Sequence, residues 1–303
     1  MTNPLPSSTP LAAPPPSGLQ PPSVLLMGMP GSGKSYALST LLAAGLEVFI
    51  LGTEAGFIDT VLDACAARKI DTSRLHWHAL TNAAPSWDAL ETVGKTTAAM
   101  SYESLAAIKD GIAKREMKGW MSLLHACRDF PDDRTGQRFG DVTTWGPDRA
   151  FVIDSLSGIN DVAREHVTGY KPNLHPGEWG TAQELERNLI RKLVVDRRCF
   201  FVLTAHLDRT VDEVTQTPLI TVAALGSKLG PKLPKDFSEV VLAKRPGKAN
   251  DPFTWSTLEA NADTKNRSLP IGAGLPADFR PVVDAYRKRA IDSQAPTPVA
   301  GAA

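Results

Sequence analysis

The sequence predicts an α/β fold: a mostly parallel, twisted sheet flanked by helices, with a short antiparallel extension near the C-terminus. Apolar runs of strand length alternate with helical segments along the chain. A glycine-rich motif joins the first strand to the first helix. After Pro218 the strands become shorter, which predicts the antiparallel part.

The first strand and helix surround the most informative motif of the chain. A buried strand over residues 24–27 leads into Gly-Met-Pro-Gly-Ser-Gly-Lys-Ser, and a helix over 36–44 follows. The motif matches GxxxxGK[ST], in which backbone N–H groups and the helix N-terminus surround a phosphate. A chance glycine-rich turn is the alternative, and the flanking strand and helix argue against it. The residues expected to bind the nucleotide, ATP, are Gly28, Pro30, Gly31, Ser32, Gly33, Lys34, Ser35 and Tyr36.

The other elements follow in chain order. Apolar, β-branched and aromatic runs predict strands, and helical periodicity or a capping box predicts helices. The capping box is Thr181 with Glu184. Strands are expected over 47–51, 75–80, 150–153, 199–204, 219–222, 239–243 and 253–258, helices over 55–68 and 181–195, and helical structure within 92–127.

Composition limits the class of protein. A chain of 303 residues accommodates one large domain, expected over 23–292, between proline-rich or small-residue tails over 1–22 and 293–303 that we expect to be disordered. The formal net charge is zero, so no global basic field indicates nucleic acid. Three widely spaced cysteines and the lack of a secretory signal or membrane-length apolar run predict a cytoplasmic protein.

Polar residues at the ends of three predicted strands complete the expected site. Lys34 would reach the terminal phosphates, and Ser35 with Asp154 would hold Mg²⁺. Asp154 alternatively caps the next helix. Ser155 follows it, so a catalytic base must come from elsewhere. Glu54, expected beside the strand that precedes the glycine-rich motif, would orient and deprotonate water, or else only favours a helix N-terminus. His206 would sense the γ-phosphate or make a plain structural hydrogen bond.

This set of residues resembles the RecA-like P-loop ATPases in element order over about residues 23–289. The glycine-rich motif is shared by every P-loop class, but an acid after the second strand and none after Asp154 are similar to this family. The resemblance implies that Glu54 is the catalytic glutamate.

A late motif adds to the resemblance. Lys265-Asn266-Arg267 is similar to the Lys-Asn-Arg motif of RadA/Sms and to the Lys-x-Arg pair of DnaB-type helicases. In those families the Lys and Arg reach a neighbouring subunit's γ-phosphate, so the resemblance implies a ring or filament. A solvated charge pair is the alternative. The zinc finger and the protease-like domain of RadA/Sms are not visible here. The chain therefore looks more like small bacteriophage-encoded RecA-like ATPases, including single-strand annealing recombinases.

The same resemblance implies contacts with single-stranded DNA. Two loops face DNA in the family, and here they correspond to 169–178 and 206–218. A basic Gly/Pro-rich segment over 226–235 follows. Solvated loop charges are the alternative. The expected contacts are Lys171, Arg209, Lys228 and Lys232.

The function expected from the sequence is a Mg²⁺-dependent, DNA-dependent ATPase acting in recombination or single-strand annealing. Its expected partners are single-stranded DNA, other copies of itself, and a single-strand-binding or replication protein. One alternative is a small-molecule or nucleotide kinase, for which Arg134 and Arg138 are the lid-like candidates. Another is a slow nucleotide-switched module that loads a replication protein.

Overall fold

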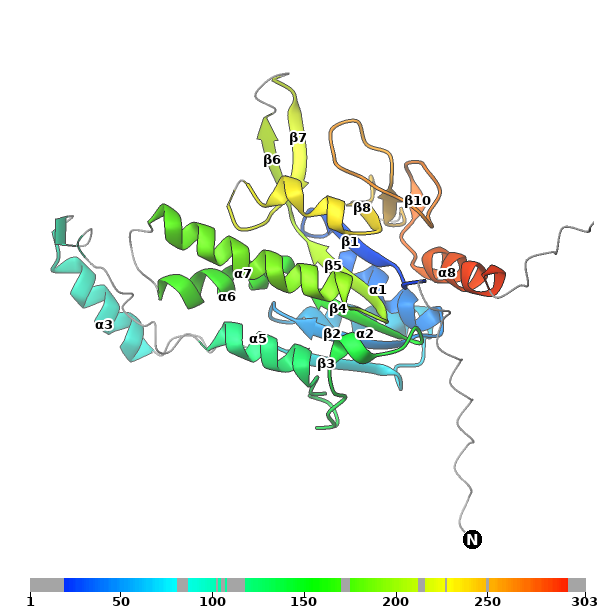
Figure 1. Cartoon of the computed structure of the whole chain (residues 1–303), viewed down its shortest axis with the longest axis horizontal. Coiled ribbons are helices and arrows are strands. Elements are labelled where there is room, and N and C mark those ends of the chain that lie inside the picture. The colour runs from blue at the N-terminus through cyan, green and yellow to red at the C-terminus, as the bar shows by residue number, and fades with distance from the viewer. Residues whose placement is uncertain are drawn as a thin grey trace, which may run out of the picture.

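An eight-stranded sheet forms the centre of the molecule, and Figure 1 shows helices on both of its sides. The computed structural model describes residues 19–80, 87–101, 103–104, 107, 118–169, 175–211, 216–226, 228–248 and 251–293. Across the sheet the strands run in the order β10 (Leu275–Pro276), β9 (Thr254–Ser256), β8 (Glu239–Lys244), β1 (Ser23–Gly28), β5 (Phe200–Ala205), β4 (Arg149–Asp154), β2 (Glu47–Gly52) and β3 (Leu75–Ala79).

The six strands from β8 to β3 are parallel, and β9 and β10 add antiparallel strands at one edge. The predicted fold class is therefore confirmed: a mostly parallel sheet flanked by helices, with antiparallel C-terminal strands. All the residues of β1 and β5 are buried, because both faces of a parallel sheet are covered.

Two hydrophobic cores lie on the two faces of the sheet, and alternate residues of each strand enter them. Leu25 and Met27 belong to one core, whereas Val24 and Leu26 belong to the other. The first core receives α5 (Gly119–Arg128), α6 (Leu156–Thr168) and α7 (Pro176–Val195), and the second receives α1 (Lys34–Ala43), α2 (Phe57–Arg68) and α8 (Arg280–Asp292). Helix α3 (Trp87–Ala98) lies at one end of the molecule in Figure 1.

A separate two-stranded sheet projects from the body next to the carboxyl end of β5 (Figure 1). It is an antiparallel hairpin of β6 (Leu207–Val211) and β7 (Pro218–Val222). The resemblance implied a loop over 206–218, which was wrong for residues 207–211 and 218, because they belong to these two strands. In the described part of the chain, short 3-10 turns also form at Val142–Thr144, Gly230–Lys232 and Pro234–Asp236.

The strand order corrects two sequence-based predictions. Strand β8 pairs with β1 in parallel, although we expected it in the antiparallel extension. Strand β2 is not next to β1, because β5 and β4 lie between them. Hydrophobicity identifies a buried strand but carries no direct information on its neighbours, so the order could not be read from the strands alone.

The predicted capping box was also wrong. Helix α7 begins at Pro176, and His175 with Glu178 forms the capping box in place of Thr181 with Glu184. Thr181 instead donates its hydroxyl to the carbonyl of Gly177 inside the helix. The predicted helical region within 92–127 is represented by α3 and α5, and residues 108–117 lie outside the described part.

Residues near the domain boundaries pack against the core. Pro21 and Pro22 are buried, and the guanidinium of Arg197 donates to the Pro21 carbonyl. Residues 1–18 and 294–303 lie outside the described chain, so the two predicted tails remain predictions. Among the described helices, none is long and apolar enough to cross a membrane.

Candidate nucleotide-binding site

The glycine-rich motif lies between the carboxyl end of β1 and the N-terminus of α1. Gly31 and Gly33 have φ angles of +73° and +80°, a left-handed conformation that glycine adopts without strain. A side chain at Gly33 would also collide with the ring of Phe253. Both glycines are therefore required by the path of the backbone around the expected phosphate.

Lys34 is buried beneath this loop, with 7 % of its surface exposed. Its ammonium group donates to the carbonyls of Gly28 at 2.8 Å and Met29 at 3.2 Å. Burial lowers the pKa of Lys34, and the carboxylates of Asp154 and Glu54 counteract part of this effect. The structure thus holds a partly desolvated cation at the position where the sequence predicts phosphate.

The two residues predicted to hold magnesium are in direct contact. The hydroxyl of Ser35 donates to Asp154 Oδ2 at 2.7 Å, and Thr204 donates to the other carboxylate oxygen. Burial raises the pKa of Asp154, which has 5 % of its surface exposed. Nearby cationic charge would stabilise the ionised form of this carboxyl group.

Glu54 lies at the end of β2, and hydrogen bonds join this strand end to the end of β4. The Thr53 hydroxyl donates to the carbonyl of Ser155 and accepts from its N–H, both at 2.8 Å. The Ser155 hydroxyl donates to Glu54 Oε1, and His206 Nε2 lies 3.5 Å from the same oxygen. The order of the strands therefore brings Glu54, His206 and Asp154 together at the carboxyl end of the sheet.

A cavity of about 320 Å³ collects these groups, in the size range of ligand sites. Within it, the buried Ser32 hydroxyl has no hydrogen-bond partner. An unsatisfied hydroxyl in a glycine-rich loop at a helix N-terminus fits a phosphate oxygen as its acceptor. The residues that line the cavity are Pro30, Gly31, Ser32, Gly33, Lys34, Ser35, Tyr36, Glu54, Thr60, Asp154, Ser155, His206 and Phe253.

The ion predicted at Ser35 and Asp154 also fits the donor set. A hydroxyl and a carboxylate are oxygen ligands of the kind that Mg²⁺ uses together with water and phosphates. Across the described ranges, no group of three or more His, Cys, Asp or Glu side chains forms a metal site. A magnesium ion that keeps several waters does not require such a group.

Sequence reasoning missed two residues beside the motif. The Arg245 side chain donates through Nε to the carbonyl of Pro30 at 2.7 Å and lies near Gly31. The ring of Phe253 covers Gly33 and lies 5.5 Å from the Tyr36 ring. Arg245 directly follows β8, so its position next to the motif depends on the parallel pairing of β8 with β1. The incorrect antiparallel prediction for β8 concealed it.

A second cavity, of about 600 Å³, adjoins the first and shares Tyr36 and Phe253 with it. The guanidinium of Arg68 stacks over the Tyr36 ring at 4.3 Å from its centroid. Asp278 and Arg280 line the same cavity and bind each other. A lining of aromatic rings and a few polar side chains is typical of sites that bind planar heterocycles.

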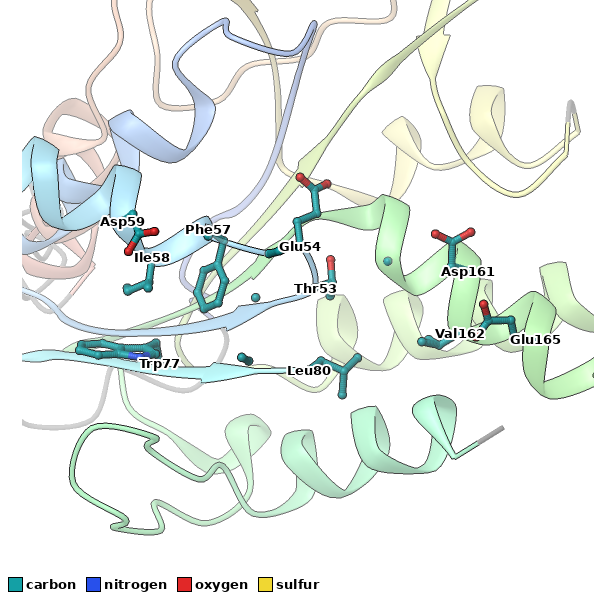
Figure 2. A pocket seen from close by; sticks show the side chains of 15 residues that line it. Thr53, Glu54, Phe57, Ile58, Asp59, Trp77, Leu80, Asp161, Val162 and Glu165 are labelled. Carbon is teal, nitrogen blue, oxygen red and sulfur yellow. The ribbon is translucent and has the colours of Figure 1, made fainter. Parts of the chain in front are cut away.

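A third cavity, of about 630 Å³, lies on the other side of Glu54. Figure 2 shows Phe57 and Trp77 on one side of it and Asp161 and Glu165 of α6 on the other. Glu54 lines both this cavity and the nucleotide cavity, and its side chain is exposed. Water can therefore reach the Glu54 carboxylate.

Lys265 and Arg267 lie away from these cavities. Lys265 pairs through its backbone with Val240, near the amino end of β8, and its ammonium group donates to the carbonyls of Lys235 and Phe237 at 3.1 and 2.7 Å. The Arg267 N–H donates to the buried Glu239 carboxylate, whereas the Arg267 side chain is exposed. Within one chain the motif is thus at the opposite edge of the sheet from Lys34.

The predicted lid arginines are at the amino end of the sheet as well. Arg134 donates to the carbonyls of Thr72 and Ser73, which precede β3, and Arg138 binds Asp129 within its own loop. Neither side chain lies against the nucleotide cavity. This arrangement gives the kinase alternative no lid in the described residues.

The residues predicted to contact DNA fall into two groups. Arg209 is exposed on the projecting hairpin, and Lys228 and Lys232 are exposed in the segment that follows it. Lys171 lies outside the described residues. Three of the residues predicted to contact DNA therefore lie on the hairpin or in the segment after it, and none of the three lines the nucleotide cavity.

Comparison with solved structures shows similarity at the level of the backbone. The chain is similar to a solved structure described as the crystal structure of the RadB recombinase. The two chains are 13 % identical, the match covers 84 % of this chain and 86 % of the other, and the TM-score is 0.37. No protein-family model matches the chain, and no curated protein matches it.

Proposed function

We propose that this chain binds ATP with Mg²⁺ and hydrolyses it. The observation that carries the proposal is the contact between Ser35 and Asp154, at 2.7 Å, beside the desolvated ammonium of Lys34. Side chains from the first turn of α1 and from the end of β4 meet there beside a glycine-rich loop. Such a meeting of cation, hydroxyl and carboxylate supports phosphate chemistry.

Positioning and charge stabilisation are the main tasks of a site that transfers a phosphoryl group. Lys34 would exchange its two carbonyl partners for phosphate oxygens and neutralise their charge. Ser35 and Asp154 would hold Mg²⁺, which would supply positive charge to stabilise the negative charge of the phosphates. Thr204 keeps the Asp154 carboxylate in place through its hydrogen bond.

Glu54 is the proposed general base. Ser155 and His206 orient its carboxylate, while its exposure leaves it open to water. From this position Glu54 would orient an attacking water and accept its proton on a carboxylate oxygen. His206 would report on the charge near the γ-phosphate, because it contacts Glu54 and directly precedes the hairpin.

The nucleobase is proposed to enter the cavity lined by Tyr36 and Phe253. This cavity adjoins the phosphate-binding loop through the same two rings. Stacking on an aromatic ring supplies apolar contact, and Asp278 and Asp251 provide acceptors for an exocyclic amino group.

Assembly and DNA binding belong to the same proposal. Arg267 is exposed at the sheet edge opposite to the nucleotide site, so it can act on ATP only in another copy of the chain, which supports a ring or filament. The bonds of Lys265 to two carbonyls support a role in ordering this segment. Arg209 on the projecting hairpin, with Lys228 and Lys232, would bind single-stranded DNA phosphates. Recombination or single-strand annealing is the proposed setting.

The test is phosphate release from ATP with Mg²⁺, measured with and without single-stranded DNA. We expect turnover that DNA stimulates and that Lys34→Ala abolishes, whereas Lys69→Ala, a change beyond the end of α2, leaves it unchanged. Turnover that persists in Lys34→Ala would contradict the proposed site. Slow turnover that ignores DNA would replace the DNA-dependent ATPase with a nucleotide-switched module.

A further inference from the structure

The loop over 223–226 connects the hairpin to the rest of the chain directly behind His206. The Ala223 N–H donates to the carbonyl of His206 at 2.9 Å. Leu207, the first residue of β6, pairs with Val222, the last residue of β7. Any displacement of His206 therefore acts on both ends of the hairpin and on this loop.

Side chains from two helices hold the loop by its backbone. Asn160 of α6 donates to the Ala223 carbonyl at 3.0 Å. From α7, Gln183 donates to the Leu225 carbonyl at 2.9 Å, and Glu186 Oε2 accepts from the Leu225 N–H at 3.4 Å. The loop thus depends on side-chain partners on two helices.

Glu186 is unusual among these partners because it is completely buried. Its second oxygen, Oε1, has no hydrogen-bond partner, and neither do the buried Asn160 Oδ1 and His206 Nδ1. Burial raises the pKa of Glu186 to about 8. A buried polar atom without a partner destabilises the folded state, so three around one loop call for an explanation.

A loop with two arrangements provides that explanation. The present arrangement leaves acceptor and donor capacity unused on Asn160, Glu186 and His206, so it does not exhaust the hydrogen bonds that these side chains can make. A shift of the loop changes which of its backbone groups these atoms meet. A ligand that moves His206 then favours one arrangement through its differential affinity.

We propose that Glu186, together with Asn160, is a positioning residue that holds the loop over 223–226 and couples the nucleotide state at His206 to the β6–β7 hairpin. This coupling rests on the proposed nucleotide site, but the hold on the loop does not. Glu186 touches neither the nucleotide cavity nor the expected phosphates. It acts through the backbone of Leu225 and, from there, through Ala223 and His206.

Amide hydrogen exchange tests both parts. Without nucleotide, we expect the Leu225 amide to exchange at least tenfold faster in Glu186→Leu than in the wild-type protein. Glu186→Gln, which keeps an acceptor oxygen, should restore its protection. Glu184→Gln, an exposed change on the same helix, should have no effect. Equal exchange in Glu186→Leu and wild type would overturn the hold on the loop. Asn160→Ala, which frees the Ala223 carbonyl, gives a second reading should Glu186→Leu not fold.

The coupling is tested with ADP and with a non-hydrolysable ATP analogue, while nucleotide affinity is measured separately. We expect the exchange of residues 207–211 and 218–222 to differ between the two nucleotides in the wild-type protein. That difference should vanish in Glu186→Leu at unchanged nucleotide affinity and return in Glu186→Gln. Nucleotide binding without any difference in wild type, or a difference that survives in Glu186→Leu, would overturn the coupling. If the wild-type protein does not bind nucleotide at all, the proposed function itself is contradicted.

Discussion

The two ends of the central sheet carry similar polar residues, but these residues differ in whether their hydrogen bonds are satisfied. At the amino end, His76 lies between Asp132 at 3.0 Å and Glu47 at 3.3 Å, and the Glu239 carboxylate accepts from two backbone N–H groups. At the carboxyl end, the Ser32 hydroxyl and His206 Nδ1 are buried without partners. His76 and Glu239 at the amino end are thus satisfied by the chain itself, whereas groups at the carboxyl end retain unused hydrogen-bonding capacity.

This difference separates structural from functional polar groups. A buried polar group that has all its partners contributes to one defined structure, while an unsatisfied one favours a ligand that supplies the missing partner. The loop with Arg134 belongs to the satisfied group, because its aspartates bind His76, His78 and the backbone of β3. The expected ligand-binding end is therefore the one with Lys34 and Asp154.

The largest expected effect is that of Arg267, which tests whether the amino end of the sheet has a purely structural role. It lies at the amino end, so a role in hydrolysis requires that this end of one copy serves the carboxyl end of another. Arginines that reach a neighbour's phosphates contribute on the order of 10³–10⁵ in rate. We expect Arg267→Ala to lower phosphate release by about that factor while nucleotide binding is retained.

The neighbouring Lys265 is the matched comparison. Lys265→Ala removes hydrogen bonds to the carbonyls of Lys235 and Phe237, so it should lower the midpoint of urea unfolding more than Arg267→Ala does.

Mixing the Arg267→Ala and Lys34→Ala proteins should recover part of the turnover, because the first supplies an intact Lys34 and the second an intact Arg267. Full turnover in Arg267→Ala alone would confine this residue to structure.

Glu54 gives the next largest effect, at the carboxyl end itself. Removal of a general base typically lowers the rate by about 10²–10⁴. Glu54→Gln keeps the size of the side chain and should lower kcat in this range with little change in nucleotide affinity. Asp59→Asn, which also lines the cavity beyond Glu54, is the control and should keep its activity. Equal kcat values for Glu54→Gln and the wild type would leave the base unassigned.

The sequence was sufficient to predict the parts of the site that depend on local pattern. The glycine-rich motif, the strand that ends in Asp154 and the acid at Glu54 are each visible within about ten residues, because strand, turn and helix signals lie next to one another. The fold class followed from their alternation. Contacts of Ser35 with Asp154 could be expected from the rule that parallel strands end at one edge.

Other parts depend on contacts between distant segments and could not be predicted. Arg245 reaches Pro30 only because β8 pairs with β1, and pairing partners leave little trace in a strand's own composition. Glu186 lies on a helix whose pattern alone gives no reason to bury a glutamate. Its position depends on a loop more than 30 residues further on. The functional meaning of such a residue is visible only once its missing partners are counted.

The smallest expected effect is on the pH dependence of stability, and it tests whether the buried Glu186 is unsatisfied in the folded chain. Burial raises the pKa of Glu186 to about 8, whereas an unfolded glutamate has a pKa of about 4.3. Between these values the folded state holds a proton that the unfolded state has lost. The free energy of unfolding should therefore fall as pH rises, by at most about 1.4 kcal/mol per pH unit.

His76 at the amino end shifts stability in the same direction, so the wild-type curve alone cannot separate the two groups. Burial lowers the pKa of His76, but its hydrogen bonds to Glu47 and Asp132 outweigh this and raise it. The stabilisation that these bonds give is present at low pH and is lost as pH rises through the raised pKa.

Glu186→Gln removes only the contribution of Glu186 to this pH dependence. Urea unfolding at pH 6, 7 and 8 should therefore show the variant gaining stability relative to wild type as pH rises, and Glu184→Gln should not. Parallel curves for Glu186→Gln and wild type would mean that Glu186 is already ionised in the folded chain. Its carboxylate would then have to be satisfied there like those at the amino end.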